Sequence, residues 1–120
     1  AGKEAYLMKK NIKDKWLTAL QSGKYIHTRG ELEEIAKFSE DRTNRCCALG
    51  VLMKINGYAP WDHDNMMYDP DDSNTPSQEL PSQDLLEKWG MDEKEANDIA
   101  MYNDKRDDYN EVIKYIKESL

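Results

Sequence analysis

The stretch "CCALGVLM" (Cys46–Met53) decides the fold, because none of its eight side chains is charged or strongly polar. Such a run is buried on all sides whatever its conformation, so it marks the centre of the core. Thr43 or Asn44 can cap a helix before it, and Gly57 stands where the end of a helix favours glycine. We therefore expect a buried helix here, in which Gly50 lets another backbone approach closely.

An amphipathic helix is expected upstream of this run, from Asn11 to the pair Ser22-Gly23. The stretch Tyr25–Thr28 that follows has a strand-like composition. Residues 31–44 fit either a helical face or a short hairpin, and both alternatives stay open. The first helix is expected because apolar side chains recur there every four residues, namely Ile12, Trp16 and Leu20.

Three short helices are expected in the last third of the chain. The first begins after Ser82 and stops at Gly90. The spacing of a capping box opens the other two, through the pairs Asp92 with Glu95 and Asp108 with Glu111. The predicted fold class is therefore mainly α, a compact domain of about five short helices. An α+β fold stays open through a small hairpin near residues 25–38.

The length and charge of the chain restrict the classes of function. With 120 residues it has the size of one domain; residues 1–7 precede Met8 and are set aside as a candidate expression remnant, which leaves 8–120 as a single globular domain. The formal charge of -7 repels phosphate backbones, so no nucleic-acid partner is expected. No stretch approaches the ~18 consecutive apolar residues of a membrane span, so we expect no membrane partner and a cytoplasmic location.

A long polar loop is expected at about 58–81, because apolar periodicity stops there and Asp, Asn, Pro and Ser accumulate. Long loops in compact domains are usually functional or disordered. Aromatic, methionine and acidic side chains alternate in its first half, which favours a pocket for a small ligand. The candidate ligand-binding residues are Trp61, His63, Met66 and Tyr68 of this loop, with His27 from the strand-like stretch.

Cys46 and Cys47 are the candidate nucleophiles of a cysteine-dependent hydrolase. In the first turn of a helix the dipole would stabilise a thiolate. His63 would then be the base, and Asp62 would orient it. The competing interpretation is that both thiols only pack in the core, and we favour it because small thiols in an apolar run are typically buried. The enzyme question stays open, with the noncatalytic interpretation preferred.

No metal site and no cofactor are expected. An EF-hand loop counted from Asp69 would need glycine and glutamate where Asn74 and Leu80 stand. Adjacent cysteines seldom both reach one tetrahedral ion, which argues against a zinc site built from the four side chains that could bind zinc: His27, Cys46, Cys47 and His63.

Three segments resemble a family of small uncharacterised phage and bacterial proteins. They are "KWLTALQSGKY" (Lys15–Tyr25), "CCALGVL" (Cys46–Leu52) and the tail from "LPSQDLLEKWGM" to the closing helix. The family pattern reads tryptophan-x-x-alanine-leucine-x-serine-glycine, then cysteine-cysteine-leucine-glycine-valine-leucine, then leucine-asparagine-aspartate. Here Ala48 replaces the usual leucine, Met53 stands where a third cysteine often follows, and Tyr102-Asn103-Asp104 carries the asparagine-aspartate pair.

This resemblance implies a phage-related accessory protein of the bacterial host cytoplasm and supplies no activity. The preferred hypothesis is a noncatalytic domain that binds a host protein or a small ligand. The cysteine-dependent hydrolase is the alternative, and the oligomeric state stays open.

Overall fold

The computed structural model describes residues 8–30, 32, 45–60, 65–69 and 72–120. This part of the chain is mainly helical, which confirms the predicted fold class. Its helices are α1 (Lys10–Gln21), α2 (Ala48–Ile55), α3 (Gln83–Trp89), α4 (Glu93–Lys105) and α5 (Asn110–Ser119). Its strands are β1 (Ile26–His27), β2 (Arg45–Cys46), β3 (Met66–Asp69) and β4 (Asp72–Pro81). Within these ranges no helix has the length and apolar composition needed to cross a membrane.

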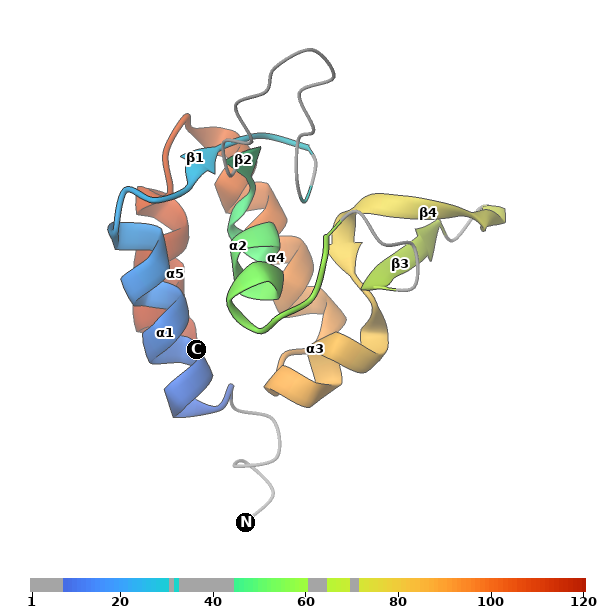
Figure 1. The fold of residues 1–120 in the computed structure, drawn as a ribbon, viewed down its shortest axis with the longest axis horizontal. Coiled ribbons are helices and arrows are strands. Elements are labelled where there is room, and N and C mark those ends of the chain that lie inside the picture. Colours follow the sequence, from blue (N-terminus) through green and yellow to red (C-terminus); the bar gives the residue numbers. More distant parts are fainter. Residues whose placement is uncertain (1–7, 31, 33–44, 61–64, 70–71) are drawn as a thin grey trace.

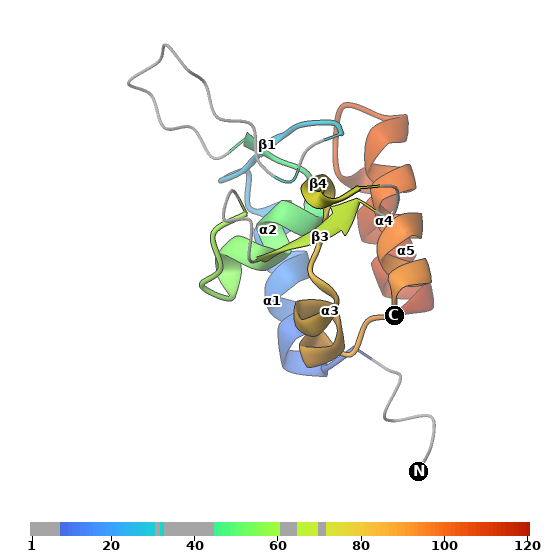
Figure 2. The same cartoon turned by 90° about the vertical axis from the view of Figure 1, so that its right-hand side faces the viewer.

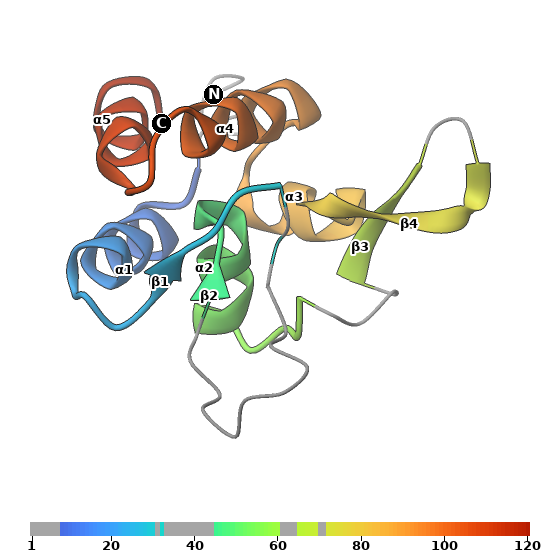
Figure 3. The ribbon, with the colours of Figure 1, turned by 90° about the horizontal axis from the view of Figure 1, so that it is seen from above.

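Helix α2 lies at the centre of the helical packing and contacts both α1 and α4 (Figure 1). Figures 2 and 3 both show α4 and α5 together in one layer, which packs on a second layer formed by α1, α2 and α3. Every residue of α2 from Ala48 to Met53 is buried. The prediction that this run forms the centre of the core is therefore confirmed.

The side chain of Trp16 fixes α1 against α2. It is fully buried, and its indole N–H donates to the backbone oxygen of Ala48 at 2.8 Å. Buried indole groups usually need such a partner, so this contact adds direction to the apolar packing. The predicted apolar stripe of α1 thus faces the core through Trp16 and Leu20.

Gly50 allows the backbone of Leu32 to lie directly on α2. A Cβ atom at Gly50 would stand 1.7 Å from the backbone oxygen of Leu32. That same oxygen accepts the backbone N–H of Cys47 at 3.3 Å, just before the helix begins. The close approach expected at Gly50 is therefore confirmed, with Leu32 as the neighbour.

The strands form two small sheets. β1 lies in the predicted strand-like stretch and pairs with β2 in parallel, with His27 opposite Cys46. An antiparallel pair, β3 with β4, extends away from the helices (Figure 1). Of the possible hairpin near 25–38, the described residues contribute β1; residues 31 and 33–44 lie outside the described ranges, so the hairpin stays a prediction.

The expectation of an irregular loop at about 58–81 is wrong for residues 66–69 and 72–81, which form β3 and β4. The register of this pair shifts on both sides of Tyr68. Backbone pairing satisfies the N–H and C=O groups of a polar sequence without any alternation of apolar side chains. The strands consequently gave no signal in the hydrophobic pattern.

The predicted starts of α1, α2 and α5 differ from the structure. α1 begins at Lys10 with Lys9 as its N-cap residue, so Asn11 lies inside the helix instead of capping it. α2 begins at Ala48 with Cys47 as its N-cap residue, so neither Thr43 nor Asn44 caps it. Cys46 belongs to β2 and Cys47 precedes the first helical residue, so neither cysteine lies in the first turn. Pairing of β2 with β1 keeps this segment extended up to the helix.

The capping boxes of α4 and α5 had the same spacing, yet only that of α4 forms. Asp92 and Glu95 bond reciprocally at the start of α4. In α5 the N-cap residue is Tyr109, whose buried hydroxyl donates to the backbone oxygen of Cys46 in β2. Asp108 instead accepts the N–H of Asn110, and Glu111 pairs with Arg106.

Gly50→Ala should destabilise the protein. Helix propensity alone predicts a gain of roughly 0.5–1 kcal/mol for this change, whereas overpacking costs roughly 1–3 kcal/mol. Because the new Cβ would meet a backbone atom, we expect overpacking to dominate and the free energy of unfolding to fall. Urea denaturation of both proteins measures the difference, and a stabilised variant would contradict the packing of Leu32 on α2.

Candidate functional site

Asn103 of α4 is the buried polar residue at the junction of α2, α4 and the end of β1; 1% of its surface is exposed. Its Oδ1 accepts the backbone N–H of Ala48 at 3.0 Å. Its Nδ2 donates to the backbone oxygen of Thr28 at 2.9 Å and to Oδ1 of Asp104 at 3.1 Å. The orientation of the amide follows from these partners, because only its oxygen can accept an N–H. One side chain thus ties three segments together.

Asp104 and Asp107 bind the segment that follows β1. Oδ1 of Asp104 also accepts the N–H of Gly30 at 3.1 Å. Farther out, Asp107 forms an ion pair with Arg29 at 2.5 Å. Both side chains of this pair are exposed, so it contributes little stability, but it crosses from the β1 segment to the loop between α4 and α5.

His27 is held against the same junction. Its Nε2 lies 2.7 Å from the backbone oxygen of Asn103. A carbonyl oxygen only accepts, so Nε2 carries the proton, and in the neutral ring Nδ1 is an acceptor. The His27 ring also packs edge-on against Tyr109, with centroids 5.2 Å apart. The Tyr109 hydroxyl in turn donates to the backbone oxygen of Cys46 at 2.6 Å.

A cavity of about 480 Å³ opens beside these rings, between the end of α1, β1 and the start of α5. We call it the His27 cleft. Leu20 and Ile113 supply apolar wall, and Asp107 and Asp108 are its carboxylates. Its lining residues are Leu20, Gln21, Gly23, Tyr25, His27, Asp107, Asp108, Tyr109, Asn110 and Ile113. A volume of this size suits a small molecule or a single side chain of a partner.

Of the residues predicted to bind a ligand, His27 lies at this cavity. Met66 and Tyr68 belong to β3, which extends away from the helices. Trp61, Asp62 and His63 lie outside the described residues, so the predicted pocket in this loop stays a prediction. The structure therefore brings His27 together with Tyr25 and Tyr109, two residues that the sequence does not single out for ligand binding.

Both cysteines are buried, with exposures of 0% for Cys46 and 4% for Cys47. Burial raises the pKa of the Cys47 thiol to about 12. The N–H groups of Leu49 and Gly50 at the start of α2 act in the opposite direction, but their effect is smaller. Desolvation of the thiolate thus outweighs the favourable helix terminus, and Cys47 is a thiol at neutral pH.

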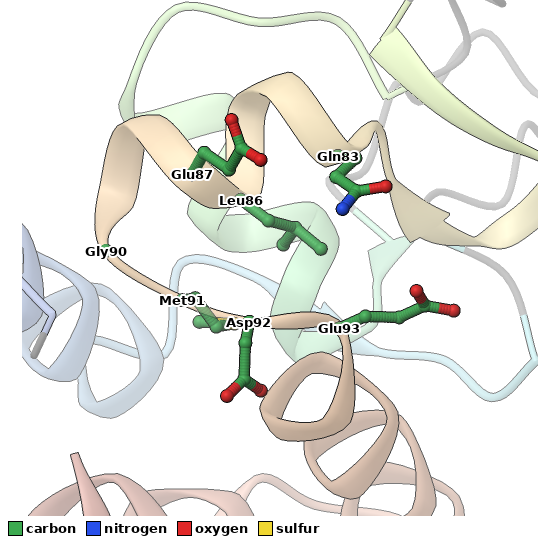
Figure 4. A pocket seen from close by; sticks show the side chains of 7 residues that line it. All are labelled: Gln83, Leu86, Glu87, Gly90, Met91, Asp92 and Glu93. Carbon is green, nitrogen blue, oxygen red and sulfur yellow. The ribbon is translucent and has the colours of Figure 1, made fainter. Parts of the chain in front are cut away.

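A second, smaller cavity of about 280 Å³ lies at the junction of α3 and α4 (Figure 4). Its floor is apolar, with Leu86 and Met91 buried. The carboxylates of Glu87, Asp92 and Glu93 point in three different directions rather than toward one point. No group of metal ligands is found among the described residues. We place the candidate site at the His27 cleft because its lining combines an imidazole, two tyrosine rings and two carboxylates.

One signal in the sequence could have found Asn103. It follows Ala96 and Ile99 on the buried face of α4, where a polar residue is out of place. Asparagine is also unfavourable inside a helix unless its side chain has a specific partner. Tyr109 gave no comparable signal, because an aromatic residue on an apolar face is indistinguishable from ordinary core.

The fold and the site define a small α-rich domain with a buried asparagine junction and an adjacent cleft. The chain belongs to the family described as a domain of unknown function, DUF8296, whose family model matches residues 8–120. Comparisons with curated proteins and with solved structures find no match.

The buried thiol predicts a loss of stability at alkaline pH. The ordinary thiol pKa is 9.0 and the folded value is about 12, so the unfolded chain releases this proton first. The contribution of this thiol to the free energy of unfolding should be constant below pH 9 and should fall as the pH rises toward 12. Burial also raises the pKa of Tyr109, which adds to the fall.

Urea denaturation across this pH range tests the linkage. In Cys47→Ala the free energy of unfolding should fall less at alkaline pH than in the unmodified protein. Part of the fall should remain, because Tyr109 still contributes to it. An identical pH dependence in the two proteins would contradict the assignment of Cys47 as a desolvated thiol.

Proposed function

We propose that this domain is a noncatalytic binding domain and that the His27 cleft receives its ligand. The observation that carries the proposal is the fixed orientation of His27. Its Nε2 end is bonded to Asn103 and its ring rests on Tyr109, so the ring is held at the cavity wall. Preorganised polar groups in a partly apolar cavity are typical of a ligand site.

The polar groups of the cleft remain available to a ligand. Within the described part of the chain, Nδ1 of His27 and the hydroxyl of Tyr25 have no hydrogen-bond partner. Gln21 and Asn110 add side-chain amides to the wall. By contrast, both thiols are buried away from any substrate, which leaves the hydrolase alternative without support. From the resemblance of its motifs alone, we propose a phage-related accessory role in the host cytoplasm.

Three aromatic probes of one ring size test the proposal: benzamidine, benzoate and phenol, which are cationic, anionic and neutral. Each is titrated to about 10 mM into ¹⁵N-labelled protein, a range that detects dissociation constants near 1 mM. We expect at least one probe to shift the amide signals of Gly23, His27 and Asn110. These residues line the cleft, so their amides report its occupation.

A pair of tryptophan variants provides the control. Gln21→Trp fills the His27 cleft from an exposed position of α1 and should abolish these shifts. Gln83→Trp makes the same change at the α3–α4 cavity and should leave them intact. Absence of shifts with all three probes, or shifts that survive Gln21→Trp, would refute a ligand site in the cleft.

A further inference from the structure

We infer that the His27 cleft selects a guanidinium or amidinium cation, such as an arginine side chain or a small guanidine compound. This inference rests on the proposed function and names the chemical class of its ligand. Its basis is the combination of carboxylates, aromatic rings and an imidazole acceptor around one cavity.

The charges of the lining favour a cation. Asp107 and Asp108 face the cavity, and no lysine or arginine is among its lining residues. Arg106 pairs with Glu111, and Arg29 already pairs with Asp107, so within the described part of the chain Asp108 is the lining carboxylate without an ion-pair partner. The formal charge of -7 on the whole chain adds a long-range attraction for cations.

The start of α5 would ordinarily attract an anion, because free N–H groups gather at a helix N-terminus. Here Asp108 already occupies that position, and its Oδ1 accepts the N–H of Asn110 at 3.0 Å. An incoming anion would meet this carboxylate. The fold itself therefore supplies the anion that the helix terminus favours.

The aromatic rings favour a flat cation that can stack. Tyr25, Tyr109 and His27 all line the cavity. Two lining residues already contact cations of the chain: Lys24 Nζ lies 5.9 Å from the centre of the Tyr25 ring, and the Arg29 guanidinium pairs with the Asp107 carboxylate. A guanidinium combines both contacts, because it stacks on aromatic rings and donates in a planar fork.

The acceptors of the cleft lie on different elements, which favours a planar guanidinium with several N–H donors over a compact ammonium group. Nδ1 of His27 belongs to β1, whereas Asp107 and Asp108 belong to the loop before α5. A guanidinium has N–H donors directed to several sides, so one group can bond acceptors on two walls. An ammonium group is more compact and more strongly hydrated, and it stacks less well on aromatic rings.

Isothermal titration calorimetry at low salt tests this inference with N-acetyl-arginine amide and N-acetyl-citrulline amide, which differ mainly in charge. We expect heat of binding for the arginine compound and at least tenfold weaker binding for the citrulline compound. The double variant Asp107→Asn with Asp108→Asn should weaken the arginine compound at least tenfold. Asparagine at 108 still accepts the N–H of Asn110, so the start of α5 is preserved.

Glu111→Gln is the control for the loss of a negative charge near the cleft. It removes one negative charge a turn away, at a residue that pairs with Arg106 and does not line the cleft. We expect less than a twofold change. Equal binding of the arginine and citrulline compounds would overturn the inference. So would a loss of binding in Glu111→Gln as large as that in the double variant.

Two further comparisons complete the test. The first distinguishes a small-molecule ligand from an arginine of a partner protein, and the second distinguishes failure of this inference from failure of the proposed function. Methylguanidine that binds as tightly as an arginine-containing pentapeptide indicates a small-molecule ligand, and tighter binding of the peptide indicates a partner's arginine; both support the cation class. Binding of phenol or benzoate in the cleft without binding of any guanidinium probe overturns the cation class and leaves the proposed function standing. Absence of all binding in the cleft overturns both.

Discussion

The bond from the backbone N–H of Ala48 to the side chain of Asn103 is the constraint on which the arrangement of α2 depends. The first N–H groups of a helix have no partner within it and are usually satisfied by the N-cap side chain. Here Cys47 occupies the N-cap position and forms no capping bond. Asn103, which lies 55 residues away in sequence, supplies the acceptor instead. The start of the core helix is therefore fixed by a tertiary contact with α4.

The same amide controls the position of the cleft. Asn103 holds the end of β1 through the oxygen of Thr28, and its own backbone oxygen holds the His27 ring. Cys46 continues this network, because its backbone oxygen accepts from Thr28 N–H and from the Tyr109 hydroxyl. Two walls of the cleft, β1 and the start of α5, are thus anchored to one buried junction. A ligand entering the cleft would meet side chains that are already in place.

The sequence predicted those elements whose signals are local. The ends of α3 follow from Ser82 and Gly90, and the start of α4 follows from the pair of Asp92 and Glu95. The start of α2 could not be predicted in this way, because its capping partner comes from a distant helix. The β3–β4 pair has no alternating apolar pattern, so the sequence predicts a loop there.

The candidate site was only partly predictable for the same reason. His27 was selected for its chemistry, but the cleft exists because β1 lies beside the loop between α4 and α5. That contact depends on Asn103, whose place on the apolar face of α4 was visible in the sequence. The cysteines drew attention as nucleophiles, and their burial gives them a packing role instead.

The most direct test of the central role of Asn103 compares two asparagines of α4 by urea denaturation. Asn103→Ala removes the acceptor of the buried Ala48 N–H and a donor to the Thr28 oxygen, and a buried group left unsatisfied costs about 1–3 kcal/mol. Asn97→Ala makes the same change at an exposed position of the same helix. We predict that Asn103→Ala lowers the free energy of unfolding by about 2–4 kcal/mol more than Asn97→Ala does. A difference below about 0.5 kcal/mol, the range of ordinary surface substitutions, would contradict the account.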